Sequence, residues 1–354
     1  MIARKSPEAA FRVNCLSMAT RAGISLRLPF SIIGTKVSPA SKKSFLRLVD
    51  VATRHHVWGD SIEGQLDRAL ELQDRVVAAV LRATLPNIRG AEIERASRAA
   101  PRSLNAYGLA MRALPLLFAS RPDASRHALE LLHHAIDIDP SHPLATALAA
   151  WGHGQLVMYN GTSTPNEERR LAAQLVRRAA MFDDDDPLAL TARCAVHTMA
   201  NDFEVAETLV TRALAIDPTS GWAWGRSAWL HSYRGNSELA IAQFRRALLT
   251  DPRASRANDF VGIGTAHFNV GRYEAAAASL RKALIDHPGT VWANRSLSVS
   301  YARTGDRLKA VDSLDALRRS CPDLTVSQVM AAVPFRPGFL DRLGDGLSAL
   351  GLPP

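Results

Sequence analysis

The chain has 354 residues, of which 47% are hydrophobic and 22% charged, a composition typical of a protein with at least one large core. No apolar run approaches the roughly 18 residues that a membrane-spanning helix needs, so no membrane span is expected. Cys15, Cys194 and Cys321 are far apart and form no CxxC pair. This spacing argues against a disulfide framework or a cysteine zinc site and favours a reducing, cytoplasmic compartment.

The net charge of +9 is concentrated in the first 58 residues. Ten Lys and Arg residues there oppose only Glu8 and Asp50, a local charge of +8, so the rest of the chain is close to neutral. The basic segment has no interleaved aromatic residues of the kind that stack on bases. We therefore expect no nucleic-acid binding by the body of the protein.

The first hundred residues predict several kinds of structure. Residues 1–43 are basic, show no sustained hydrophobic period and are expected to be disordered. The stretch FLRLVDVATRHHVWGD (45–60) has two short β-rich runs around a polar turn, which predicts a hairpin. A helix is predicted in GQLDRALELQDRVVAAVLRATL, ending at Pro86, and a shorter one at about 89–98.

Further along, one phrase is repeated. ALAIDP, at 213–218, returns with small changes as AIDIDP, ALLTDP and ALIDHP. The prolines from Pro218 to Pro322 follow one another at intervals of 34, 36 and 34 residues. A helix–turn–helix unit with a period of 34 is the signature of the tetratricopeptide repeat.

The residues before each of these prolines explain the repeat physically. Two antiparallel helices approach closely only where one side chain is as small as alanine, and a bulky residue four positions on fills the neighbouring space. Glycine suits the left-handed turn between the helices, and proline ends the second helix. The small residues are Ala206, Ala240, Ala276 and Ala310; the bulky ones Val210, Phe244, Leu280 and Leu314; the next small or apolar ones Ala213, Ala247, Ala283 and Leu317; the glycines Gly235, Gly271 and Gly305.

The same spacing extends backwards to repeats that end at Pro140 and Asp184, which gives six helix pairs between about 103 and 322. In the second pair, the polar insert NGTSTPNEE separates helices at about 143–158 and 166–182. The predicted fold class is therefore all-α. It is a right-handed superhelical solenoid of about six helix pairs, preceded by the hairpin and its helices.

The chain from about residue 45 resembles a bacterial family on three stretches: HVWGDSIEGQLDRALELQDRVVAAVLRATLPNIRGAEIERA, SLNAYGLAMRAL with the repeats after it, and CPDLTVSQVMAAVPFRPGFLDRLGDGLSALGLPP. In that family an α/β domain, often called TolB-like, precedes the repeats. Upstream of it lies a class III adenylate/guanylate cyclase domain or a winged-helix DNA-binding domain. The resemblance implies a regulatory protein of that kind.

Only 44 residues precede the hairpin here, fewer than either upstream domain needs. We therefore expect a C-terminal half without its output domain, and a hairpin whose free strand edge allows self-association. The expected parts are a disordered segment (1–43), a hairpin and helices from a partial TolB-like domain (44–101), the solenoid (102–323) and a helical cap (324–354).

Candidate chemical groups have simpler interpretations. The run DDDD (183–186) has the oxygen ligands of a cation site, but we interpret it as a loop whose last acid caps the next helix. His133 and His134 are adjacent on a predicted helix and point in different directions, so packing or surface roles are favoured over a metal site. No nucleophile elbow, HExxH helix or phosphate loop occurs. We expect no enzyme activity, no cofactor and no metal.

The predicted function is that of a binding surface. First helices of stacked pairs line a concave groove, and aromatic residues with Arg and Asn are typical of peptide recognition there. The partner is expected to be a protein or peptide, with acidic character because of the arginines, whereas Trp224 is assigned to the packed interior. The predicted groove residues are Trp222, Trp229, Tyr233, Asn258, Phe268, Asn269, Trp292, Arg295 and Arg303.

Three hypotheses from different classes follow. The first is a non-catalytic interaction module that binds its partner in the groove, in bacterial signalling or regulation. The second is the regulatory half of a cyclase or a winged-helix regulator, acting by association. The third is an enzyme with a site that no motif reveals.

Overall fold

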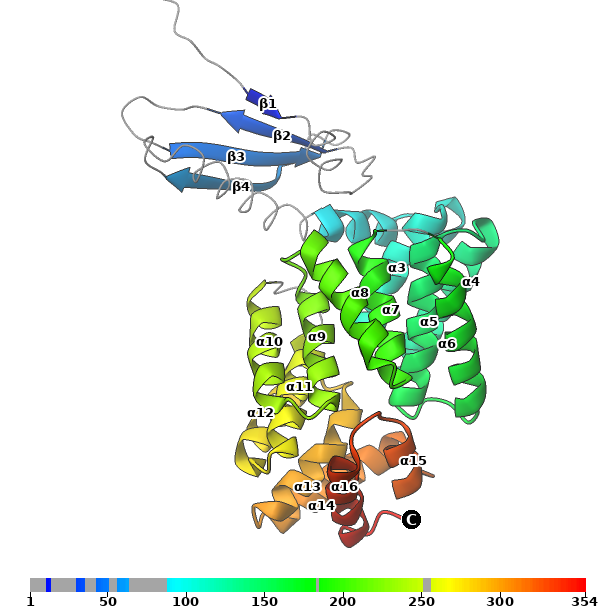
Figure 1. Ribbon diagram of the computed structural model, residues 1–354, viewed down its shortest axis with the longest axis vertical. Helices are drawn as coiled ribbons and strands as arrows, with labels where there is room; N and C mark the ends of the chain where they lie inside the picture. The colour runs from blue at the N-terminus through cyan, green and yellow to red at the C-terminus, as the bar shows by residue number, and fades with distance from the viewer. Residues whose placement is uncertain are drawn as a thin grey trace, which may run out of the picture. The chain divides into compact units, whose positions relative to one another are not determined.

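The computed structural model describes residues 11–13, 30–35, 43–50, 56–63, 88–182, 185–250 and 256–354. Backbone contacts divide the chain into two compact units, Met1–Arg95 (unit 1) and Ala96–Pro354 (unit 2). Figure 1 labels the strands of unit 1 and the helices of unit 2.

Unit 1 contains a four-stranded antiparallel sheet with the order β1-β2-β3-β4. β3 (Lys43–Asp50) pairs with β4 (His56–Glu63), and the register shifts between Leu48 and Val49. This pair lies where the hairpin at 45–60 was predicted. β1 (Phe11–Val13) and β2 (Phe30–Thr35) extend the sheet on the β3 side.

Two expectations for this region need correction. The segment 1–43 was expected to be disordered, yet it supplies β1 and β2. The hairpin was expected to leave a strand edge exposed, but β3 has no exposed edge: it pairs with β4 on one side and with β2, from Phe30 to Thr35, on the other. β4 is the last strand in the sheet order, so self-association through the hairpin stays a prediction for β4 alone. The helix predicted to end at Pro86 lies outside the described residues, whereas residues 88–98 are helical as expected.

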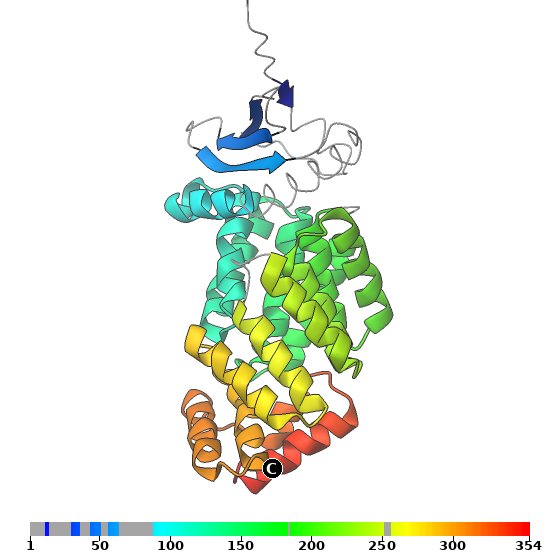
Figure 2. The same ribbon diagram turned by 90° about the vertical axis from the view of Figure 1, so that its left-hand side faces the viewer.

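Over its described residues, unit 2 contains six successive helix pairs, the number predicted for a tetratricopeptide solenoid. Figures 1 and 2 show these helices from two sides. In both views the C-terminal helices lie together at one end of the unit. The pairs are α3 (Ala106–Phe118) with α4 (Pro122–Ile138), α5 (Pro143–Met158) with α6 (Pro165–Ala180), α7 (Pro187–Met199) with α8 (Phe203–Ile216), α9 (Gly221–Tyr233) with α10 (Ser237–Thr250), α11 (Arg256–Asn269) with α12 (Tyr273–Asp286), and η3 (Val291–Ala293) plus α13 (Asn294–Arg303) with α14 (Arg307–Ser320); α15 (Val326–Ala331) and α16 (Pro337–Ala349) follow.

The contact between the two helices of a pair has the predicted register. Ala206, Ala240, Ala276 and Ala310 are all 0% exposed. The bulky residues beside them are also buried. Phe244 lies so close to Gly262 that a Cβ added there would be 2.1 Å from its Cζ. The small residues thus set how closely consecutive helices approach.

The turn inside each pair is left-handed throughout. Gly235, Gly271 and Gly305 have φ values of 84°, 75° and 85°, as predicted. The first three pairs place Ser120, Asn160 and Asn201 at the corresponding position, with φ between 51° and 62°. A positive φ is energetically unfavourable for residues other than glycine, but less so for Asn than for most.

Acidic residues end and begin several helices. Asp139 and Asp217, each just before the proline, accept hydrogen bonds from Ser141 and Thr219 two residues on, through both the backbone N–H and the hydroxyl. Asp186, the last residue of DDDD, accepts from the Leu188 N–H at 2.7 Å and caps α7, as predicted. The aspartates before the prolines therefore order the loops between pairs.

The register makes a direct prediction for stability. Ala240→Arg should lower the free energy of unfolding by more than about 3 kcal/mol, because the site has no room and would bury a charge. Ala242→Arg is the matched control, since Ala242 is exposed on the same helix. Urea unfolding followed by circular dichroism measures both variants. Equal stability of the two would contradict the register.

Candidate functional site

The predicted groove residues lie on α9, α11, η3 and α13, the first helices of the last three pairs. We call this surface the inner face. The structure corrects the exposure that we assigned to it. The Trp292 side chain is partly buried. Six of the predicted residues are at most 5% exposed: Trp222, Trp229, Tyr233, Asn258, Phe268 and Arg295. Binding of a partner by these residues stays a prediction.

The C-terminal helix α16 covers part of the inner face. Phe335, just before α16, meets the Tyr233 ring edge to face at 4.5 Å, and Phe339 meets Phe268 at 5.3 Å. Arg342 donates a hydrogen bond to the carbonyl oxygen of Asn269 at 2.7 Å.

At its far end, α16 touches α13. A Cβ added to Gly346 would lie 2.4 Å from Val299 Cγ1. The segment expected to cap the solenoid thus also crosses the first helices of three successive pairs.

The first helix pairs cover another part of the inner face. The Trp222 ring lies 4.8 Å from that of Trp151 on α5. Trp292 Nε1 donates to the carbonyl oxygen of Ser120 at 3.1 Å, and its ring stacks on Tyr159 at 5.1 Å. Pairs far apart in the sequence therefore contact each other across the inner face, which explains why its aromatic residues are buried.

Two residues on the margins differ from the rest. Arg303, predicted in the groove, is exposed. Trp224, assigned to the packed interior, is only partly buried: its Nε1 donates to the Pro218 carbonyl oxygen at 3.0 Å, and the Arg246 guanidinium lies 3.8 Å from the ring centroid. The structural roles predicted for Trp224 and Trp229 are therefore exchanged.

Two arginines are buried on the inner face. Arg226 and Arg295 are 7% and 5% exposed, and their Nε atoms have no hydrogen-bond partner among the described residues. Arg295 donates to Asn160 Oδ1. With its amide oriented to suit its neighbours, Asn258 accepts from Arg226 and, at 3.2 Å, from Trp229 Nε1.

Charge compensation for these arginines is missing in the described part of the chain. No ion pair joins either of them to a carboxylate there. Burial lowers the pKa of Arg295 to about 10. The inner face thus contains buried cations whose hydrogen-bond partners are neutral.

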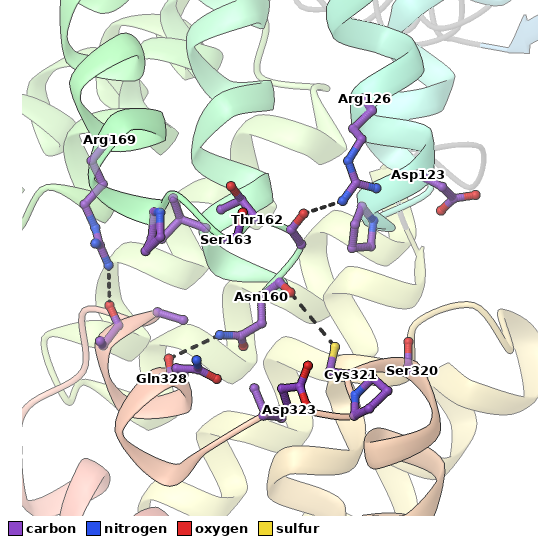
Figure 3. Close-up of a pocket in the computed structure, with 18 residues that line it drawn as sticks. Asp123, Arg126, Asn160, Thr162, Ser163, Arg169, Ser320, Cys321, Asp323 and Gln328 are labelled. Carbon is purple, nitrogen blue, oxygen red and sulfur yellow. Dashed lines mark hydrogen bonds between the residues drawn. The ribbon is translucent and has the colours of Figure 1, made fainter.

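The polar insert and the residues after it are bonded to the C-terminal part of the chain (Figure 3). Asn160 Nδ2 donates to the Gln328 carbonyl oxygen at 3.2 Å, and Arg169 donates to that of Ala331 at 2.6 Å. These bonds join the turn after α5 and the first half of α6 to α15. They link residues that are more than 160 positions apart.

A pocket of about 710 Å³ lies beside these bonds. The insert, the start of α4, the end of α14 and α15 line it, and the labelled side chains in Figure 3 include Arg126, Arg169 and Cys321. Arg126 donates to the Gly161 carbonyl oxygen. The lining contains one thiol, that of Cys321, and no histidine.

Among the residues that the structure describes, no group of three or more His, Cys, Asp or Glu side chains is arranged to hold a metal ion. Within the same ranges, none of the helices combines the length and apolar character needed to cross a bilayer.

Sequence reasoning missed the residues that complete the inner face. Arg226 was passed over because it does not occupy a groove position of the repeat. The partners Ser120, Asn160, Phe335 and Phe339 lie outside the repeats whose groove positions were assigned. The pair of phenylalanines in FRPGFLDRL, spaced by four residues, was the available signal for an amphipathic helix.

Comparison with known proteins gives fold-level similarity. No protein-family model matches the chain, and no curated protein matches it. Similar solved structures include a chain of the APC/C hetero-tetramer Cut9–Hcn1, with 15% identity and a TM-score of 0.48 over 75% of this chain and 48% of that one. The match thus spans about half of that protein's length.

Two smaller proteins are covered more completely. PilW, a type IV pilus biogenesis factor, shows 20% identity and a TM-score of 0.41 over 56% of this chain and 87% of its own. YrrB, described as a TPR protein with an unusual peptide-binding site, shows 19% identity and a TM-score of 0.34 over 57% and 95%. The tetratricopeptide assignment of unit 2 rests on its own period and helix packing.

The different burial of Trp229 and Trp224 makes a prediction for stability. Trp229→Ala should cost about 3–5 kcal/mol of unfolding free energy, because its buried ring contacts Tyr233, Phe244 and Trp292. Trp224→Ala should cost clearly less, because that ring is partly exposed. Urea titrations of the two variants decide the matter, and a larger loss for Trp224→Ala would contradict the burial described here.

Removing a buried charge should stabilise the protein. Arg295→Met keeps the volume and eliminates a cation without a carboxylate partner, so the free energy of unfolding should rise by about 1–2 kcal/mol. Arg303→Met, on the exposed end of the same helix, should change it by less than about 0.5 kcal/mol. Denaturant unfolding tests both, and a strong loss of stability in Arg295→Met would show that the cation is compensated in the folded chain.

Proposed function

We propose that the chain is a non-catalytic protein-interaction module whose inner face binds an amphipathic helix of a partner protein. One observation carries the proposal: the inner face already holds such a helix, the chain's own α16. A surface that fits α16 is suited to a segment with the same pattern of side chains.

The contacts of α16 define that pattern. Phe335 and Phe339, four residues apart, supply two rings, and Arg342, seven residues after the first, supplies a hydrogen bond to Asn269. Their partners come from α9 and α11: Phe335 reaches α9 from the extended residues just before α16, and Phe339 and Arg342 reach α11 from α16 itself. The partner segment would carry aromatic residues at i and i+4 and a hydrogen-bond donor at i+7.

An acidic group in the partner would complete the recognition. Arg226 and Arg295 have donor atoms without partners on the same surface. A carboxylate brought to them would gain charge-assisted hydrogen bonds in a site shielded from water. This supports the acidic partner expected from the sequence. A role in bacterial regulation rests on the resemblance of residues 45–354 alone, and we propose it on that ground.

Any such partner would compete with α16. A tethered helix acts at an effective concentration in the millimolar range, so a free peptide binds the intact chain weakly. Weakening the tethered helix should therefore strengthen the binding of a free one. This relation makes the proposal testable without knowledge of the natural partner.

The probe is a fluorescent peptide with the sequence of residues 333–349. We expect it to bind the full chain carrying Phe335→Ala and Phe339→Ala at least about tenfold more tightly than wild type, measured by fluorescence anisotropy. A peptide with the same two substitutions should bind neither protein.

The matched control is the full chain with Asp341→Ala and Asp345→Ala, on the exposed face of α16. It should bind the peptide as wild type does. Circular dichroism establishes that each variant is folded. Equal binding of the peptide to wild type and to the folded double-phenylalanine variant would refute the proposal.

A further inference from the structure

Three ionisable side chains from three helices meet beside the first pairs of unit 2. His133 lies on α4, His153 on α5 and Glu168 on α6. The Nε2 atoms of the two histidines are 3.3 Å apart, and Nδ1 of His153 lies 2.6 Å from Glu168 Oε2. The side chain of His153 is 8% exposed, and that of Glu168 is 15% exposed.

The carboxylate of Glu168 sets the tautomer of His153. Since a carboxylate accepts a hydrogen bond, Nδ1 of His153 carries the hydrogen and donates it. The lone pair of the neutral ring is then on Nε2, which faces His133. A carboxylate behind a histidine in this way orients metal-binding histidines and makes the ring a better ligand.

The spacing of the two Nε2 atoms matches a shared metal ion. Zinc binds histidine nitrogens at about 2.0–2.1 Å in tetrahedral geometry, which places two such nitrogens about 3.3–3.4 Å apart. In the metal-free chain the same spacing accommodates one hydrogen bond from His133 Nε2–H to His153 Nε2. A metal ion would replace that hydrogen.

We propose that His133 and His153 bind one divalent transition-metal ion, with zinc as the probe and Glu168 as the residue that positions His153. Imidazole nitrogen suits zinc, copper and nickel. Since no third His, Cys, Asp or Glu completes a ligand set within the described ranges, water fills the other positions. His133 is on the exposed side, which leaves room for these waters.

The surrounding charges favour a cation. The negative charges of Asp137 and Glu168 attract a cation at His133, and Glu167 interacts electrostatically with His153. Arg170 pairs with Glu167 and is the one cation that contacts these acids through an ion pair in the described structure. Burial, and then the neighbouring His153, lowers the pKa of His133.

Zinc titration of the full, tag-free chain by isothermal calorimetry tests the proposal. Wild type should bind one equivalent that His133→Gln lacks. His134→Gln is the matched control, because it removes the adjacent exposed histidine and should keep that equivalent. Melting curves without zinc establish that both variants are folded. Identical zinc binding by wild type and His133→Gln would overturn the site, and so would the absence of binding by wild type.

The positioning role of Glu168 has its own readout. Glu168→Gln should weaken zinc binding by about tenfold or more. Cobalt in place of zinc should give a visible absorption band in wild type that is lost in His133→Gln and retained in Glu168→Gln at saturating cobalt. Unchanged zinc affinity in Glu168→Gln would refute the positioning role, and a cobalt band in His133→Gln would refute the assigned ligand.

Discussion

The close contact of two helices at an alanine is the constraint on which the rest of unit 2 depends. Ala240 and Ala276 are 0% exposed. Phe244 and Leu280 fill the space against Gly262 and Gly264 of the adjacent helix α11. Each pair is therefore built to nearly the same geometry. Pairs of one geometry stack with a constant rotation, which brings their first helices onto a common surface. The inner face is thus a consequence of packing inside the pairs.

The inner face combines aromatic contacts that stabilise the fold with buried charges that oppose it. Because α16 and the first pairs cover the inner face, it acts as a second hydrophobic core. The contacts between its aromatic rings stabilise the folded state. Buried guanidinium groups in the same place oppose this gain, because their desolvation is only partly offset by neutral amides. A surface built only for stability would hold apolar residues at Arg226 and Arg295.

Local signals predicted the repeat well. The period of 34, the alanine register and the turn glycines each depend on neighbours within one pair, and all three were confirmed. Exposure on the inner face was predicted wrongly, because it depends on a rotation summed over several pairs. The bond from Trp292 to Ser120 spans 172 positions and no repeat position encodes it. For the same reason His133 was dismissed: its partners His153 and Glu168 come from two other helices.

The links between distant pairs change how unit 2 can come apart. A simple solenoid unfolds by fraying from its ends, since each repeat touches only its neighbours. Here the turn after α5 is bonded to α15, and the turn after α3 to η3. Fraying at either end must therefore break contacts with the opposite end. Unit 2 is thus expected to lose its structure in one cooperative step, and the removal of a terminal repeat to be felt along its whole length.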